Sequence, residues 1–329
     1  MQDDSLISII IPTYNRGYII KETLNSVLDQ TYTNWECVII DDGGNDDTFG
    51  LIKNYIVTTD RFKYFKRPSN LIKGVSSCRN YGITVSKGDF IIFLDSDDVL
   101  ASYALSSRIK HFKQFPNNDF LVFTTQYFEG KISNKLGVFN IDPPVKNREN
   151  YLSLFLNHEF SWQTMSPIWK RSILLKYKFR NELYLLEDVI FHIEILFNTD
   201  IKFKRIDEID NYYRISNWGK NNNSEGVSKI FDSVSFLLKN YNEQISEDSF
   251  LEKKFRRFVK IIYLIIIKSN KTSMEKKKLL NYLKTYNYIS SKENFLFKVY
   301  AIIYKLKLNN KKDIGMYKLM NFLNKRLFQ

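Results

Sequence analysis

The chain has 329 residues, of which 44% are hydrophobic, 12 are Gly and 6 are Pro, and this composition excludes a largely disordered or fibrous protein. Its formal net charge of +13 arises in the last quarter. Residues 250–329 hold 20 Lys and Arg against 4 Asp and Glu, whereas the preceding residues hold 29 against 32. We therefore expect a nearly neutral catalytic body followed by a basic segment that is drawn to an anionic surface.

The compartment is predicted from the cysteines and the apolar runs. Cys37 and Cys78 stand in no metal-binding or redox spacing, which suits a reduced compartment. The N-terminal segment is acidic and its apolar run is short, so it does not resemble a signal peptide. The later apolar run at 261–267 is far below the roughly 20 residues that span a bilayer. We expect a cytoplasmic protein, with peripheral contact to the inner face of the cell membrane left open.

The first half alternates short apolar runs with amphipathic segments, the pattern of β-α-β units and a mostly parallel sheet. Strands are predicted at 6–12, 36–40, 62–65, 90–94 and 120–124. Helices are predicted at 18–29, 46–57, 75–86 and 102–115. Further helices are expected at 148–156 and 186–197, and an extended segment at 206–214. The polar, turn-rich segment at 219–226 predicts a boundary between a catalytic domain, 1–220, and a basic α-helical region, 221–329.

Polar residues follow three predicted strands at the points where the strands end. The first strand runs into Tyr14, the second into Asp42 and the fourth into Asp95. Ligands of open α/β sheets bind beyond the carboxyl ends of the strands. We therefore expect these residues to line one cleft.

The segment FLDSDD, residues 93–98, holds three carboxylates within four positions, those of Asp95, Asp97 and Asp98. Such a cluster repels itself unless a cation or hydrogen-bond donors lie among its members. Hard oxygen ligands suit Mg²⁺ or Mn²⁺ that bridges to phosphate oxygens. The alternative is a solvated turn in which Asp97 or, above all, Asp98 caps the next helix. The segment DDGGNDDT, residues 41–48, is open to the same alternative of an ordinary turn.

Five motifs occur in the order and at the separations found in the family 2 glycosyltransferases: IIIPTYNR, VIIDDGGNDDT, SSCRNYG, GDFIIFLDSDD and LLEDVIF. The chain resembles this family from about residue 6 to residue 214. The resemblance implies the GT-A fold, an α/β fold with a mostly parallel, helix-flanked sheet. It also implies inverting transfer of a sugar from a nucleotide diphosphate sugar, usually UDP-linked, to a hydroxyl of a glycan or lipid-linked glycan. Bacterial capsule, O-antigen or exopolysaccharide synthesis is the expected setting.

The resemblance assigns roles to the residues that match the family's motifs. Asp42 would recognise the base, Arg79 would lie near the nucleotide or its phosphates, and Asp95 would hold the ribose. Asp97, with Asp95 nearby, would hold a Mn²⁺ or Mg²⁺ that neutralises charge on the departing diphosphate. The whole predicted nucleotide-sugar pocket comprises Pro12, Thr13, Tyr14, Arg16, Asp42, Arg79, Asp95, Ser96 and Arg214.

Glu187 and Asp188 match the family's acidic pair, and Asp188 matches its catalytic base. A base is needed because an acceptor hydroxyl is a weak nucleophile whose proton a nearby carboxylate can remove. The alternative is an acidic first turn favoured by the helix dipole. His192, one turn later, could orient Asp188 or serve a structural role. Trp162 and Gln163 could bind the acceptor sugar, although a Trp is equally often a core residue.

The sequence departs from the family pattern at two places. After the segment YYR at 212–214, Ser216 and Asn217 stand where a His is expected, so we restrict metal ligation to Asp97 with Asp95 nearby. Gly44 replaces a more usual Ser and should keep the turn.

The basic segment has two main interpretations, besides a surface for a protein partner or for self-association. One is an amphipathic surface that binds anionic lipid, which would suit a lipid-linked acceptor. The other is a helical appendage with solvated lysines. A nucleic-acid partner is not expected, because the acidic cluster lies at the predicted cleft and no readout motif is present. A metal-dependent nucleotidyltransferase is opposed by the lack of a basic, glycine-rich phosphate loop. A catalytically inactive nucleotide-sugar-binding relative stays open.

Overall fold

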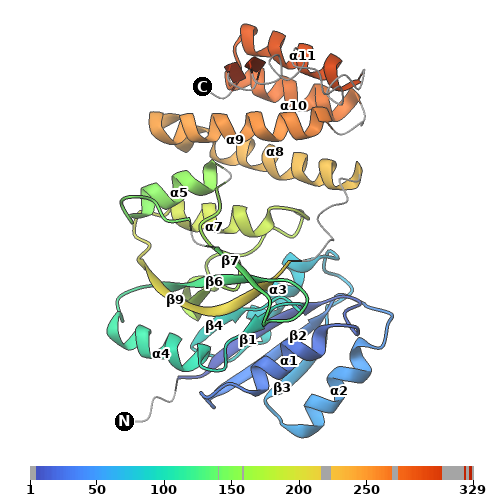
Figure 1. Cartoon of the computed structure of the whole chain (residues 1–329), viewed down its shortest axis with the longest axis vertical. Coiled ribbons are helices and arrows are strands. Elements are labelled where there is room, and N and C mark those ends of the chain that lie inside the picture. Colours follow the sequence, from blue (N-terminus) through green and yellow to red (C-terminus); the bar gives the residue numbers. More distant parts are fainter. Residues whose placement is uncertain are drawn as a thin grey trace. The chain divides into compact units, whose positions relative to one another are not determined.

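The computed structural model describes residues 5–139, 141–157, 159–215, 224–268 and 273–305, together with residues 322, 323, 326 and 327. The chain divides into two compact units (Figure 1), the first formed by Met1–Tyr151 with Phe160–Asn217 and the second by Leu152–Glu159 with Trp218–Gln329. The predicted boundary at residue 220, and the departures at Ser216 and Asn217, lie outside the described residues.

The first unit is built on one sheet with the strand order β3-β2-β1-β4-β8-β6-β9-β5, and β7 pairs with β6. Strands β1 to β4 run parallel to one another, as do β6 and β9, whereas β8 lies antiparallel between β4 and β6. The strands are β1 (Ile7–Thr13), β2 (Trp35–Asp41), β3 (Phe62–Lys66), β4 (Phe90–Phe93), β5 (Val99–Leu100), β6 (Phe120–Phe128), β7 (Lys135–Phe139), β8 (Pro167–Lys170) and β9 (Phe203–Arg214). This is the predicted α/β architecture.

The first part of the chain forms seven helices within the described residues, and all except the short one at residues 171–174 lie within two residues of the predicted positions at each end. They are α1 (Ile20–Leu28), α2 (Thr48–Thr58), α3 (Val75–Val85), α4 (Ala104–Gln114), α5 (Arg148–Leu156), α6 (Arg171–Leu174) and α7 (Glu187–Phe197). The short elements β5, β7, β8 and α6 were not predicted. β5 spans two residues and α6 a single turn, and β7 is largely exposed, so none of these three shows a hydrophobic period.

The core lies on both faces of the sheet because β1 is apolar on both sides. Side chains alternate between the two faces along a strand, so Ile7, Ile9 and Ile11 point to the same face. There they pack in a cluster with residues of α1, α2 and α4. On the other face, α3 approaches so closely that a Cβ on Gly82 would lie 2.4 Å from Cγ2 of Ile10. Each buried aliphatic side chain stabilises the fold by about 1.5–3 kcal/mol.

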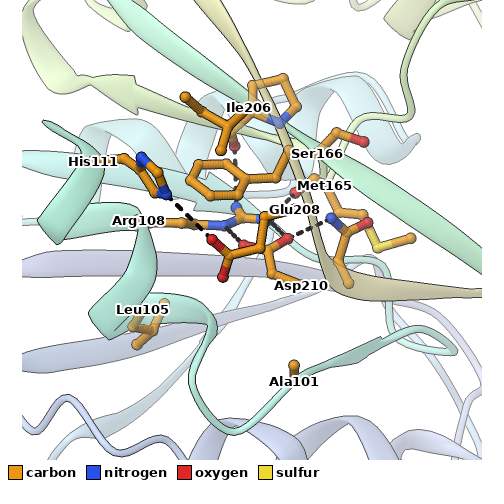
Figure 2. Close-up of polar contacts among 12 residues, drawn as sticks. Ala101, Leu105, Arg108, His111, Met165, Ser166, Ile206, Glu208 and Asp210 are labelled. Carbon is orange, nitrogen blue, oxygen red and sulfur yellow. Dashed lines mark hydrogen bonds and ion pairs between the residues drawn. The ribbon is translucent and has the colours of Figure 1, made fainter. Parts of the chain in front are cut away.

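A buried ion pair ties β9 to α4 (Figure 2). Arg108 donates to the Asp210 carboxylate from Nε at 2.6 Å and from Nη2 at 2.9 Å, and both side chains are fully buried. The same Nη2 donates to the carbonyl oxygen of Met165 at 3.1 Å. Arg108 therefore holds β9 and the segment before β8 in one arrangement, and both lead into the site described below.

The second unit contains α8 (Ser224–Glu247), α9 (Ser249–Lys268), α10 (Ser273–Thr285) and α11 (Ser291–Lys305). α9 packs against the other three helices, and its apolar stripe is buried in doing so. The stripe comprises Leu251, Phe255, Phe258, Val259 and Ile262. Lys260 is buried with it and pairs with Glu293 of α11. In the described part of the chain, no helix combines the length and the apolar character that a membrane span requires.

Candidate active site

The turns after β1 and β2 are joined by hydrogen bonds at the carboxyl edge of the sheet. The backbone N–H of Asp42 donates to the Thr13 carbonyl at 2.9 Å. Asn15 adopts a positive φ of 52°, and its Oδ1 accepts from the backbone N–H of Asn45 at 2.8 Å. Asn is among the few residues that tolerate this left-handed conformation. The two turns therefore form one rigid rim beside the buried residues Pro12 and Thr13.

Asp42, the predicted base-recognition residue, is held by two groups from the connection between β3 and α3. Arg67 Nε lies 2.5 Å from its Oδ1, and the backbone N–H of Gly74 donates to the same atom at 3.2 Å. Tyr14 is 46% exposed, and Lys73 Nζ lies 4.1 Å from the centre of its ring. An aromatic face and a fixed carboxylate are therefore presented together, which suits a planar base.

Arg79 brings the end of β4 to the start of α7. Its Nη2 lies 2.8 Å from Asp95 and its Nη1 lies 3.2 Å from Glu187, although the three residues are far apart in sequence. The Arg79 side chain is buried, so these carboxylates are its partners. Burial and the negative charge of Asp188 raise the pKa of Glu187 to about 7, and Arg79 opposes them. The predicted ribose-binding and catalytic carboxylates therefore share one cation.

The carboxylates of the DSDD turn have different surroundings. Asp97 is 24% exposed, with Arg16 Nη2 at 3.5 Å, and burial and the charge of Asp95 raise its pKa. Asp98 is buried and accepts the backbone N–H of Arg214 at 2.8 Å, and burial together with its two acidic neighbours raises its pKa well above the usual range. Ser96, which precedes Asp97, is also buried.

The capping interpretation of this turn is wrong. Strand β5 follows Asp98 directly, and α4 begins only at Ala104. Its N-terminal capping position is occupied by Tyr103, so neither Asp97 nor Asp98 caps it. Instead, Asp98 fixes the end of β9.

Arg214, at that end, lies against the same turn. Its Nε donates to the Asp97 carbonyl at 2.9 Å, and its guanidinium also pairs with Glu22. The guanidinium carbon lies 4.4 Å from the ring centre of Phe128. The predicted site residues from β1, β4 and β9 therefore meet at one edge.

Asp188 lies in the first turn of α7, after Leu186, whose φ of 59° is a left-handed conformation unfavourable for a branched side chain. The hydroxyl of Thr164 donates to Asp188 Oδ2 at 2.9 Å, and the backbone N–H of Val189 donates to Oδ1 at 2.8 Å. Neither Thr164 nor Leu186 was singled out from the sequence. No local sequence pattern around Thr164 indicates that its hydroxyl would bind Asp188.

His192 and Trp162 belong to an aromatic core instead of the cleft. Their rings lie 5.7 Å apart, and the ring of Trp169 stacks on His192 at 5.9 Å. Burial lowers the pKa of His192 to about 4, so the imidazole is neutral. Trp162 is only 3% exposed and offers no ring face to a ligand. Gln163, the other predicted acceptor residue, is partly exposed, and its role in acceptor binding stays a prediction.

The donor set suits a metal that arrives with a diphosphate. No group of three or more His, Cys, Asp or Glu side chains in a metal-binding arrangement occurs within the described ranges. Asp98 is used by β9, which leaves two accessible carboxylates in the turn: Asp95, 38% exposed and paired with Arg79, and Asp97, 24% exposed and near Arg16. Mg²⁺ is commonly held by one or two carboxylates together with substrate phosphates. The residues present fit that arrangement.

Comparisons with known proteins identify the family of the chain. The sequence model of glycosyl transferase family 2 matches residues 8–174. The chain is 33% identical over 241 residues to the poly(ribitol-phosphate) beta-N-acetylglucosaminyltransferase TarP of Staphylococcus aureus strain N315, covering 71% of this chain and 70% of TarP. It is 32% identical over 212 residues to the UDP-Glc:alpha-D-GlcNAc-diphosphoundecaprenol beta-1,3-glucosyltransferase WfaP of Escherichia coli, covering 64% of this chain and 77% of WfaP.

Among solved structures, the crystal structure of S. aureus TarS matches with a TM-score of 0.63 at 18% identity, covering 94% of this chain and 54% of TarS. The TarS fragment 1–349 in complex with UDP-GlcNAc matches with a TM-score of 0.54 at 19% identity, covering 89% of this chain and 76% of the fragment. The first unit therefore has the GT-A fold of a glycosyltransferase. The chain belongs to glycosyl transferase family 2.

Proposed function

We propose that this glycosyltransferase is inverting and metal-dependent and that its donor is a UDP-sugar. The acceptor is a hydroxyl of a glycan or lipid-linked glycan in bacterial surface polysaccharide synthesis. WfaP is named for a UDP-glucose donor and a diphosphoundecaprenol-linked acceptor, and the TarS fragment was solved with UDP-GlcNAc. These names support the donor class and the acceptor class proposed.

The observation that carries the proposal is the ion bridge of Arg79 between Asp95 and Glu187. It holds the end of β4, where the nucleotide would lie, against the first turn of α7, where the base would lie. Asp188 accepts the acceptor proton while the hydroxyl oxygen attacks the anomeric carbon and UDP leaves. Attack opposite the leaving group inverts the anomeric configuration.

Mn²⁺ or Mg²⁺, held by Asp97 with Asp95 nearby, would act as a Lewis acid toward the diphosphate. Arg16, 3.5 Å from Asp97, adds positive charge at the same place. Asp42 and Tyr14 bind the base, and the rigid rim of the two turns fixes their separation.

The test begins with UDP release from UDP-glucose, UDP-GlcNAc and GDP-mannose in the presence of Mn²⁺. Asp188→Asn is expected to abolish transfer while UDP binding survives, because the amide cannot accept the proton. Asp60→Asn, at an exposed position in the connection between α2 and β3, is the matched control. Transfer by Asp188→Asn at the rate of the control would show that the base lies elsewhere.

Metal dependence has its own test. Asp97→Ala is expected to weaken Mn²⁺-dependent UDP binding in calorimetry by at least about tenfold, because a charged ligand is lost. Equal Mn²⁺ dependence in Asp97→Ala and the unmodified protein would overturn this part of the proposal. An inactive relative would bind UDP and release none from any donor.

We also propose that the second unit binds an anionic membrane surface. The apolar stripe of α9 is buried, but α11 exposes Phe295 (64%) and Ile302 (56%), seven residues apart on one face, with the exposed Lys298 between them. Such a face suits the boundary of anionic lipid. Co-sedimentation with phosphatidylglycerol vesicles should exceed that with phosphatidylcholine vesicles and fall in Phe295→Ser/Ile302→Ser. Equal sedimentation of this variant and the exposed-site control Val57→Ser would refute it.

A further inference from the structure

Three partly exposed aromatic side chains stand together on one face of β6, β7 and β9. Tyr127 and Tyr213 are register partners with ring centres 5.7 Å apart and an interplanar angle of 80°. Phe139 lies on the other side of Tyr127, with ring centres 5.5 Å apart and an angle of 87°. We call Tyr127, Phe139 and Tyr213 the aromatic wall. Edge-to-face contacts of this kind hold the rings at fixed angles.

The sheet's alternation identifies the face on which the wall stands. Thr125 and Asn211 lie two residues before Tyr127 and Tyr213, so they share the wall's face. Thr125 Oγ1 lies 2.6 Å from Asn211 Oδ1 and 2.7 Å from the hydroxyl of Ser166. The wall's face is therefore the one that the segment 163–166 covers.

This segment joins the wall to the predicted base. Gln163 donates its backbone N–H to the Ser166 hydroxyl at 3.2 Å, and its side chain approaches the Tyr127 phenol and opposes the rise that burial causes in the pKa of that phenol. The next residue, Thr164, holds Asp188. One end of the wall therefore lies beside the residues that position the base.

The other end of the wall lies at the DSDD turn. Tyr213 directly precedes Arg214, whose backbone N–H donates to Asp98 Oδ1 at 2.8 Å and whose Nε donates to the Asp97 carbonyl at 2.9 Å. The wall therefore spans the distance between the carboxylates of the donor side and the base. An acceptor hydroxyl has to be presented along that path.

We propose that the aromatic wall and Gln163 form the acceptor subsite and that its ligand is a pyranose ring. The apolar face of the ring would pack on Tyr127 and Tyr213, and a ring hydroxyl would bind the Gln163 side chain. This inference rests on the proposed function, because it needs Asp188 as the base that receives the presented proton.

The charges near the wall favour a ring sugar over an acyclic polyol phosphate. A phosphate would require cationic partners, and the wall itself contains none. Three cations of this region are engaged elsewhere. Lys135 Nζ lies 5.4 Å from the ring centre of Tyr212, on the opposite face of β9. Arg214 pairs with Glu22, and Arg16 pairs with Asp97. A sugar ring needs only an aromatic face and a hydrogen-bonding amide.

The test measures acceptor-dependent UDP release from UDP-glucose and UDP-GlcNAc. The probes are the p-nitrophenyl β-glycosides of glucose and N-acetylglucosamine, with ribitol 5-phosphate as the alternative. The pyranosides should accelerate release and ribitol 5-phosphate should not. Tyr127→Ala and Tyr213→Leu should raise the acceptor KM by about tenfold or more while the donor KM stays within about twofold. Tyr127→Phe, which keeps the ring and loses the hydroxyl, should raise the acceptor KM less than Tyr127→Ala does.

The matched control is Tyr212→Leu, a neighbouring tyrosine on the opposite face of the same strand, which should keep the acceptor KM. Saturation-transfer NMR with methyl β-D-glucopyranoside and the Asp188→Asn protein detects acceptor binding without turnover. Adding Tyr127→Ala to the Asp188→Asn protein should abolish the saturation-transfer signal of the ligand. The inference is overturned if ribitol 5-phosphate is the better acceptor, or if the wall variants match Tyr212→Leu. If the unmodified protein releases UDP from no donor at all, the proposed function itself fails.

Discussion

The hydroxyl of Thr164 donates a 2.9 Å hydrogen bond to the carboxylate of Asp188 across 24 residues of sequence. The bond fixes one oxygen of the Asp188 carboxylate, so the acceptor sugar meets the carboxylate in a defined orientation. Thr164→Val keeps the shape and removes the donor. We expect kcat to fall about tenfold, because a hydrogen bond to a charged group contributes about 1.5–3 kcal/mol. Thr164→Ser should keep most of the activity.

The control for this prediction is Thr84→Val, whose hydroxyl bonds only within α3 to the Asn80 carbonyl. Initial rates at saturating donor and acceptor separate kcat from binding. Equal kcat values for Thr164→Val and Thr84→Val would show that Asp188 needs no such support.

Arg108→Met is expected to lower the free energy of unfolding by about 3–5 kcal/mol, because it leaves the buried carboxylate of Asp210 without its charge partner. Both side chains are fully buried and make two hydrogen bonds to each other. The double variant Arg108→Met/Asp210→Leu should recover much of the loss in urea unfolding, because no buried charge remains. A double variant less stable than the single one would contradict this account.

Gly82→Ala is expected to destabilise the protein by about 1–3 kcal/mol, because its Cβ would lie 2.4 Å from Cγ2 of Ile10. The intrinsic gain from replacing a helical Gly with Ala is about 1 kcal/mol and should not offset this overlap. Gly137→Ala is the control, since nothing lies within 4 Å of its added Cβ. Thermal unfolding that ranks the two variants in the reverse order would show that α3 can move away from β1.

The sequence alone predicts the strands that carry Asp42 and Asp95, because buried parallel strands are continuous apolar runs that end in polar turns. The sequence does not predict which residues far apart in the chain contact one another. The contact of Arg108 with Asp210 joins residues 102 positions apart, and no local pattern marks it. Trp162 illustrates the same limit, since only tertiary packing decides whether an aromatic residue lies in the core or at a ligand. Strand β7 is exposed along most of its length and so shows no hydrophobic period.

Glu187 and His192 share the first two turns of α7, and their protonation should affect stability in opposite senses. Burial and the charge of Asp188 raise the pKa of Glu187 from 4.5 to about 7, so the folded protein holds this proton longer than the unfolded chain does. The free energy of unfolding therefore falls as pH rises through that range. Burial lowers the pKa of His192 from 6.5 to about 4, so its contribution is lost as pH falls through that range. The two effects partly cancel in the unmodified protein.

Glu187→Gln removes the effect of Glu187 protonation on stability and leaves that of His192. Relative to the unmodified protein, the variant should gain stability progressively as pH rises from about 4.5 to about 7 and should gain no more above that. The gain is expected to be on the order of 3 kcal/mol, because the unmodified protein alone must ionise a buried carboxyl there. Urea unfolding at several pH values between these limits measures the difference. Glu182→Gln, at an exposed position before α7, should show no such change. A constant difference between Glu187→Gln and the unmodified protein would mean that Glu187 stays ionised throughout, with Arg79 outweighing burial.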